Sequence, residues 1–163
     1  MSGIGRPQGA PGQIVSAWLE GKFDLVVSDA LLEEFKRVLF YPRIRKLLAG
    51  AGLSNEDIQD YVDLLRLKAI TVRTDEVVLA VEPTDINDRH VLQTLVASSA
   101  DYLVTGDKKH LLSLDMNQVV PCADFVGRLQ AFKSMQVPLA ATRDLLSKIR
   151  KKRAVVSRKG ERS

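Results

Sequence analysis

Residues 100–112, ADYLVTGDKKHLL, contain a short apolar run that leads into a turn carrying an acidic side chain. The residues Tyr102, Leu103 and Val104 are nearly all apolar, which is typical of a strand covered on both faces. In open sheets of parallel strands, ligands bind beyond the carboxyl ends of the strands. We therefore expect Asp107 to face such a crevice, although an aspartate here is also an ordinary turn former.

Strand-like and helical patterns alternate along the rest of the chain. Strands are expected at 24–28, 69–73, 102–107 and 118–122, and helices at 11–22, 30–40, 42–50, 55–68, 88–100, 108–114, 123–132 and 139–153. Asp29 is expected to cap the second helix, and Ser54 with Asp57 forms a capping-box pattern before the fourth. Helices between strands require parallel crossovers, so the fold class is α/β, a three-layer α/β/α arrangement with a central parallel sheet.

The composition is that of one ordinary globular domain. The chain has 163 residues, of which 45% are hydrophobic and 27% charged. No apolar run approaches the roughly 20 residues that span a bilayer, so we expect no membrane association and a cytoplasmic protein. Cys122 is the single cysteine, which excludes a disulfide framework and a cysteine-rich zinc site.

The net charge of +4 is unevenly distributed. From Arg143 onward nine Lys or Arg residues face two acidic ones, a net of +7, so the remaining chain carries −3. The end of the chain is therefore a basic tail on a mildly acidic body. Such a tail binds phosphate backbones by counterion release, or it is simply a solvated end, and both interpretations remain open.

Several acidic residues are placed to join Asp107. Asp88 begins the helix that leads into the strand at 102–107, and Asp85 lies three residues earlier. Glu34 precedes Phe35 on the helix after the first strand, so its side chain flanks the buried stripe. Carboxylates brought together repel one another unless a cation intervenes, and their hard oxygens suit Mg²⁺ or Mn²⁺. Such a site can hydrolyse a phosphodiester.

Each of these residues also has a purely structural interpretation. Asp85 or Asp88 can be a helix cap, and Glu33 and Glu34 can form a solvated helix face. His90 and His110 lack metal-ligand spacing and are expected to be solvated or packed rather than ligands. The sequence contains no Walker lysine loop, no glycine-rich dinucleotide turn and no serine elbow, so no rival chemistry is indicated.

The order of these segments resembles the PIN-domain family, small metal-dependent ribonucleases that often act as toxins of toxin–antitoxin pairs. The resemblance covers roughly residues 9–130 and is carried by PGQIVSAWLEGKFDLVVSDALLEEFKRVL, TDINDRHVLQTLVASSADYLVTGDKKHLL and VVPCADFVGRL. It implies an RNA substrate, a cognate antitoxin, a possible homodimer, and Glu34, Asp88 and Asp107 as catalytic ligands of Mg²⁺ or Mn²⁺. Asp85 and Thr105 are implied as auxiliary residues.

The start of the chain departs from the family pattern. Family members open with an apolar central strand that ends in Asp-Thr-Asn and supplies the first metal ligand. Residues 1–9 contain no acid, and their glycines and proline do not suit a strand, so the N-terminal strand is expected to be missing. Three explanations remain open: a start codon further upstream, a decayed gene, or a non-catalytic protein whose gap is filled by a partner or by the tail.

These considerations predict a truncated PIN-like domain at 1–135 and a basic C-terminal helix or tail at 136–163. The function indicated is a metal-dependent endoribonuclease, impaired if the first acid is lacking. One alternative is a non-catalytic PIN-like module that binds an antitoxin or RNA. Another is RNA binding by the tail alone, and its candidate contacts are Lys148, Arg150, Lys151, Lys152 and Arg153.

Overall fold

The computed structural model describes residues 9–134 and 153–157 of the chain. The α-helices are α2 (Ala10–Leu19), α3 (Asp29–Leu39), α4 (Pro42–Gly50), α5 (Asn55–Lys68), α6 (Arg89–Ser98) and α7 (Cys122–Ser134). The strands are β1 (Asp24–Ser28), β2 (Ile70–Val72), β3 (Tyr102–Thr105), β4 (Val119–Pro121) and β5 (Arg153–Ser157), and two 3₁₀ turns are η1 (Ile86–Asp88) and η2 (Leu112–Leu114). Within these ranges, no helix combines the length and the apolar composition needed to cross a membrane.

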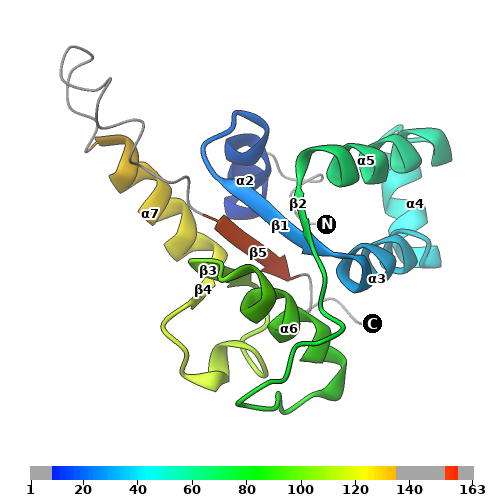
Figure 1. The fold of residues 1–163 in the computed structure, drawn as a ribbon. Coiled ribbons are helices and arrows are strands. Elements are labelled where there is room, and N and C mark those ends of the chain that lie inside the picture. Colours follow the sequence, from blue (N-terminus) through cyan, green and yellow to red (C-terminus); the bar gives the residue numbers. More distant parts are fainter. Residues whose placement is uncertain (1–8, 135–152, 158–163) are drawn as a thin grey trace.

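The five strands form one parallel sheet in the order β2-β1-β5-β3-β4. Figure 1 shows β5 lying between β1 and β3, and β1 ends where α3 begins. Thr105 at the end of β3 pairs with Ser157 at the end of β5. The carboxyl ends of the central strands therefore reach the same edge of the sheet.

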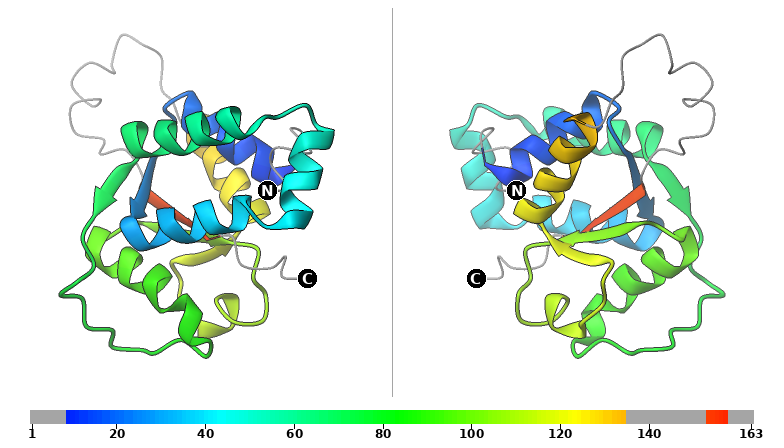
Figure 2. Two further views of the ribbon diagram at one scale, coloured as in Figure 1. Left: turned by 90° about the vertical axis from the view of Figure 1, so that its right-hand side faces the viewer. Right: turned by 90° about the vertical axis from the view of Figure 1, so that its left-hand side faces the viewer.

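Helices cover both faces of the sheet, as the sequence predicts. Alternate strand residues enter two separate apolar clusters, so Val27 and Val104 pack with α2–α5 and α7, whereas Val26 and Leu103 pack with α6. The two side views in Figure 2 show the strands between α6 on one side and the remaining helices on the other. The fold class is therefore the expected three-layer α/β/α arrangement.

The centre of the sheet is where the structure differs most from the sequence-based expectation. The sequence pattern predicts a basic helix or tail at residues 153–157, yet they form β5, which pairs with β1 and β3 on its two sides. Ala154 and Val155 are fully buried, one toward each apolar cluster. The remainder of the helix expected at 139–153 lies outside the described residues. The gap expected in the middle of the sheet is thus filled by residues 153–157.

The helices begin and end near the residues that local sequence signals predict, but two of these predictions are wrong. The capping box of α5 is present, since Ser54 and Asp57 each bond the other's backbone amide. The cap of α3 is Ser28, whose hydroxyl accepts the amide of Leu31, rather than the expected Asp29. The helix expected at 108–114 is reduced to the single turn η2, because so short a segment recovers too few hydrogen bonds to sustain a helix.

The capping box predicts a pH-dependent contribution to stability. The hydroxyl and then the backbone amide of Ser54 hold the pKa of Asp57 below its ordinary value of 3.8. Because the folded-state pKa is lowered, this contribution is present above the ordinary pKa and is lost as pH falls through the folded value. Asp57→Asn is therefore expected to lower the urea midpoint at pH 7 and to have a progressively smaller effect in strong acid. An effect that is the same at both pH values would contradict this assignment.

Candidate metal centre at the carboxyl edge of the sheet

A buried hydroxyl contact ties α6 to the end of β1. The hydroxyls of Thr94 and Ser28 are 2.7 Å apart, and Thr94 Oγ1 donates to the carbonyl of His90 at 2.7 Å. Ser28 also caps α3. The start of α3 and the start of α6 are therefore fixed beside each other, at the edge where β3 ends.

Two carboxylates and one imidazole meet at this edge. Ligand atoms of Asp85, Asp88 and His110 all lie within 4.8 Å of one another, from the segment before α6 and from the loop after β3. Opposite ligands of a Mg²⁺ ion are about 4.2 Å apart, twice a bond of about 2.1 Å. The 4.8 Å limit on the group is only slightly wider than this span, so its two carboxylates and one imidazole are close enough together to be offered to a single cation. These residues fit a divalent cation.

Asp85 and Asp88 have different local roles. Asp85 Oδ1 accepts the amide of Asn87 at 2.9 Å. Asp85 therefore caps the 3₁₀ turn η1, in agreement with the helix-cap interpretation of its sequence position. Asp88 stands at the N-cap position of α6 but makes no side-chain capping bond, and only 1% of it is exposed. A carboxylate so deeply buried is costly without charge compensation, so capping does not explain Asp88.

Asp107 is buried next to the same loop and is bound by its own turn. Its Oδ1 atom accepts the amides of Lys109 and His110 at 3.0 and 3.1 Å, and its Oδ2 atom contacts His110 Nδ1 at 3.1 Å. Burial alone would raise the pKa of Asp107, but the amide and imidazole of His110, with the amide of Lys109, together lower it below the ordinary value. The hydroxyl of the fully buried Thr105 accepts the Asp107 amide at 3.0 Å.

Glu34 reaches this neighbourhood through a histidine. Its Oε2 atom lies 2.6 Å from His90 Nε2, and His90 follows Asp88 by two residues. Glu34 is half-buried on α3, whereas Glu33 beside it is exposed and forms ion pairs with Lys36 and Arg66. The solvated-face interpretation therefore holds for Glu33. Glu34 is thus linked to the start of α6, but it is not a member of the Asp85–Asp88–His110 group.

The two histidines are the functional candidates that the sequence analysis does not identify. Both are expected from the sequence to be solvated or packed, but His110 belongs to the candidate metal group and His90 binds Glu34. His110 has a usable signal, because a histidine three residues after a turn aspartate can bond back to it, as it does to Asp107. His90 has none, because its partner Glu34 is distant in sequence.

The proposed basic contacts at the end of the chain are only partly described. Lys148, Arg150, Lys151 and Lys152 lie outside the described residues. Arg153 is the first residue of β5. Their role in RNA binding stays a prediction.

Comparison with known proteins identifies one family. A family model described as the PIN domain matches residues 1–109, which include Glu34, Asp85, Asp88, Thr105 and Asp107. The match ends before His110 and before β4, α7 and β5. No curated protein and no solved structure matches the chain.

Proposed function

Because the chain belongs to the PIN-domain family, we propose that it is a divalent-metal-dependent endoribonuclease that hydrolyses RNA phosphodiesters. The observation that carries the proposal is the grouping of Asp85, Asp88 and His110 within 4.8 Å at the carboxyl edge of the sheet. This edge is where open α/β sheets bind their ligands. Asp107 contacts His110 of this group, and Glu34 contacts His90, two residues after Asp88.

The cofactor we propose is Mg²⁺ or Mn²⁺. Bound at this edge, such a cation would lower the pKa of water and neutralise charge that develops on the phosphate. Asp88 and Asp85 would hold it, and the nitrogen of His110 favours Mn²⁺ over Mg²⁺, because imidazole suits transition metals better than Mg²⁺.

The remaining residues of the site hold the arrangement in place. Thr105 and the amides of the following turn fix Asp107, and Asp107 in turn orients the ring of His110. His90 fixes Glu34, which would accept a proton from the attacking water or complete the acidic site. No covalent intermediate is proposed.

The biological setting we propose is that of a cytoplasmic toxin with a cognate antitoxin, and the assembly we propose is a homodimer. The support is the family resemblance alone. The cations near β5 in the sequence, Lys148, Arg150, Lys151, Lys152 and Arg153, would add affinity for RNA.

A second candidate function is a non-catalytic module that binds RNA or an antitoxin. One observation favours it: the central strand β5 reads RAVVS and contains no acid, whereas the family's central strand ends in the first metal ligand. If a first acid is indispensable, this chain binds its partner without cutting it.

The proposed nuclease is tested by incubating the full chain with single-stranded RNA in Mn²⁺ and in EDTA. We expect cleavage in Mn²⁺, little or none in EDTA, and recovery when excess Mn²⁺ is added back. An upward shift in unfolding temperature with Mn²⁺ should accompany it, since a ligand at 100 times its Kd stabilises a fold by about 2.7 kcal/mol. Metal-induced stabilisation without cleavage would favour the binding module, and the absence of both effects would refute the proposed metal site.

A further inference from the structure

A basic and aromatic surface lies at the junction of α3 and α4, outside the candidate metal centre. The residues between 35 and 55 include no acid, and the exposed or partly exposed members of this α3–α4 surface are Lys36, Arg37, Phe40, Tyr41, Arg43, Arg45 and Lys46. Phe40 and Tyr41 are 46% and 42% exposed. Cations interleaved with exposed aromatic rings are the combination that binds phosphates and stacks bases.

The helical pattern explains why these side chains face outward. Helix α3 buries Leu32, Phe35 and Leu39, and α4 buries Ile44 and Leu48 against the same apolar cluster. The cationic residues between these positions are consequently directed away from the core. Phe40 ends α3 and Tyr41 precedes α4, so both rings belong to the connection between the helices.

A hollow of about 370 Å³ opens within this surface. Its lining includes Phe40, Pro42, Arg45, Lys46 and Asn55, together with the apolar residues Ala49, Leu53 and Ile58. Arg45 donates to Asn55 Oδ1 at 3.2 Å. The hollow thus combines an aromatic wall, two cations and an amide, which are the groups that contact a base and its adjoining phosphate.

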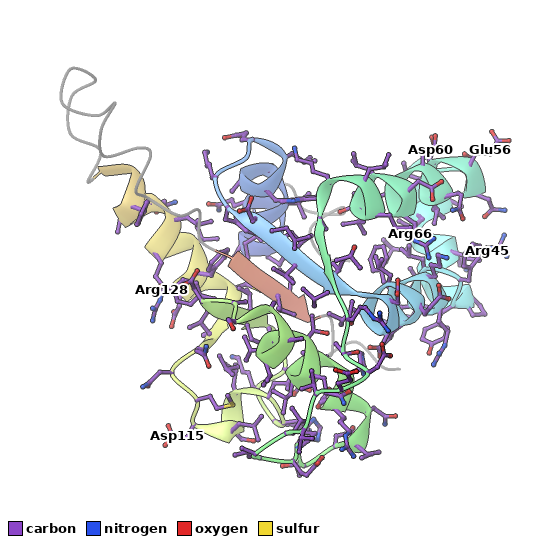
Figure 3. The ribbon with its side chains drawn as sticks, in the orientation of Figure 1. Arg45, Glu56, Asp60, Arg66, Asp115 and Arg128 are labelled. Carbon is purple, nitrogen blue, oxygen red and sulfur yellow. The ribbon has the colours of Figure 1, made fainter. Side chains whose placement is uncertain are left out.

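The charge of the surface is only partly compensated. Lys36 forms an ion pair with Glu33, which also binds Arg66 of α5. Among the described residues, neither Arg37 nor Lys46 forms an ion pair. Figure 3 shows Glu56 and Asp60 projecting from the outer side of α5, whereas Arg66 points from α5 toward α3. The surface therefore remains positive.

We propose that the α3–α4 surface binds a single-stranded RNA segment and directs it to the candidate metal centre. The inference rests on the proposed nuclease function and names the form of its substrate. Glu34 lies on α3 and Phe40 is the C-cap of the same helix, six positions or about 9 Å further along its axis. A strand whose base stacks on Phe40 and whose phosphates contact Arg45 and Lys46 is thus close enough to continue to the acidic edge. Duplex RNA would not offer an unstacked base to the hollow.

The proposal is tested by fluorescence anisotropy with a short labelled single-stranded RNA in EDTA, where cutting is prevented. Arg45→Glu is expected to raise the Kd about tenfold, and the slope of log Kd against log salt should decrease by about 0.7 for each phosphate that the variant no longer neutralises. Arg73→Glu is the matched control, because it makes the same charge change on a side chain that is 91% exposed in the loop after β2. It should change the Kd much less.

Phe40 provides the second arm of the test. Phe40→Ala is expected to weaken binding about tenfold through the loss of stacking, and Phe40→Trp should retain it. Unfolding temperatures establish that each variant folds. Equal weakening by Arg45→Glu and Arg73→Glu, or wild-type binding by Phe40→Ala, would overturn the proposal.

Three further outcomes separate this surface from the metal centre and from a protein partner. If RNA is cleaved in Mn²⁺ but neither Arg45→Glu nor Phe40→Ala changes RNA binding, the docking proposal is refuted and the nuclease proposal stands. If the wild-type chain binds RNA, the two variants weaken this binding and no cleavage occurs, the nuclease proposal is refuted and the docking proposal stands. Tighter, Phe40-dependent binding of a polyglutamate peptide than of RNA would reassign the surface to an acidic peptide and overturn the RNA assignment.

Discussion

Replacing Val155 by aspartate is expected to leave the domain unfolded. Val155 is 0% exposed in β5, the strand that joins β1 to β3. An uncompensated carboxylate at this depth costs several kcal/mol, and strand pairing on both sides is disturbed with it. Domains of this size are stable by only about 5–15 kcal/mol, so one such residue removes most or all of that stability. Loss of the cooperative unfolding transition, followed by circular dichroism, is the measurement.

Two comparisons make this prediction specific to β5. Leu67→Asp introduces the same side chain at a position of α5 that is 87% exposed, and it should leave the transition almost unchanged. Val155→Ala is expected to lower the free energy of unfolding by about 2 kcal/mol, because it leaves a small cavity without burying a charge. If Val155→Asp unfolds at the same temperature as the wild type, residues 153–157 do not form the central strand.

Asp88→Asn is expected to reduce Mn²⁺-dependent RNA cleavage by about a hundredfold or more. Asparagine keeps the shape of the side chain but removes the charge that would hold a cation in the Asp85–Asp88–His110 group. Removing an interaction that stabilises charge in the transition state reduces the rate by about 10²–10³. The same change should also abolish the stabilisation of the fold by Mn²⁺.

Without metal, the same substitution should not lower the stability of the fold. Asp88 is 1% exposed and close to Asp85, so removing its charge relieves repulsion between carboxylates and desolvation of one of them. In EDTA, Asp88→Asn is therefore expected to unfold at the same temperature as the wild type or a higher one. Asp115→Asn is the control, since Asp115 is exposed and has a positive φ of 50° that asparagine accepts. Figure 3 shows Asp115 at the outer edge of the molecule. Full cleavage by Asp88→Asn would exclude this residue from the site.

The parts of the fold that are predicted correctly depend on local rules. The run DLVVS forms a strand over the expected residues 24–28, and Ser54 with Asp57 starts α5 through the expected reciprocal bonds. The bonds that start α5 lie within a few residues of one another, whereas the strand is recognised by its local apolar run although its ladder partners are distant in sequence. Most parallel connections follow from the helices between strands, whereas β3 and β4 are joined by a loop that contains only the turn η2.

The strand β5 could not be predicted in the same way. RAVVS directly follows a run of cations that continues a helical pattern, and in that context a short apolar run does not distinguish a strand from a helix end. It is a strand because β1 and β3 present unpaired edges on both sides of it. That information comes from residues distant in sequence.

The candidate site was partly predictable for the same reason. Asp88 and Asp107 could be identified because acids follow strands or precede helices at one edge of a sheet. The pairing of Glu34 with His90 joins two helices and has no local pattern. The metal-group role of His110 depends on how the loop after β3 folds back toward Asp85. Spacing alone therefore suggests acids at this edge, whose role stays a prediction, but it does not suggest their imidazole neighbours.

The position of β5 also determines when the domain can fold. Val26 pairs with Val155, so residues far apart in the chain must meet before the sheet is continuous. During synthesis β1 and β3 leave the ribosome well before the strand that joins them. Contacts between such distant residues slow folding, and unpaired edges stay exposed in the meantime. The nascent chain therefore cannot complete its sheet until residues 153–157 have emerged, and in that interval its open strand edges are exposed to aggregation.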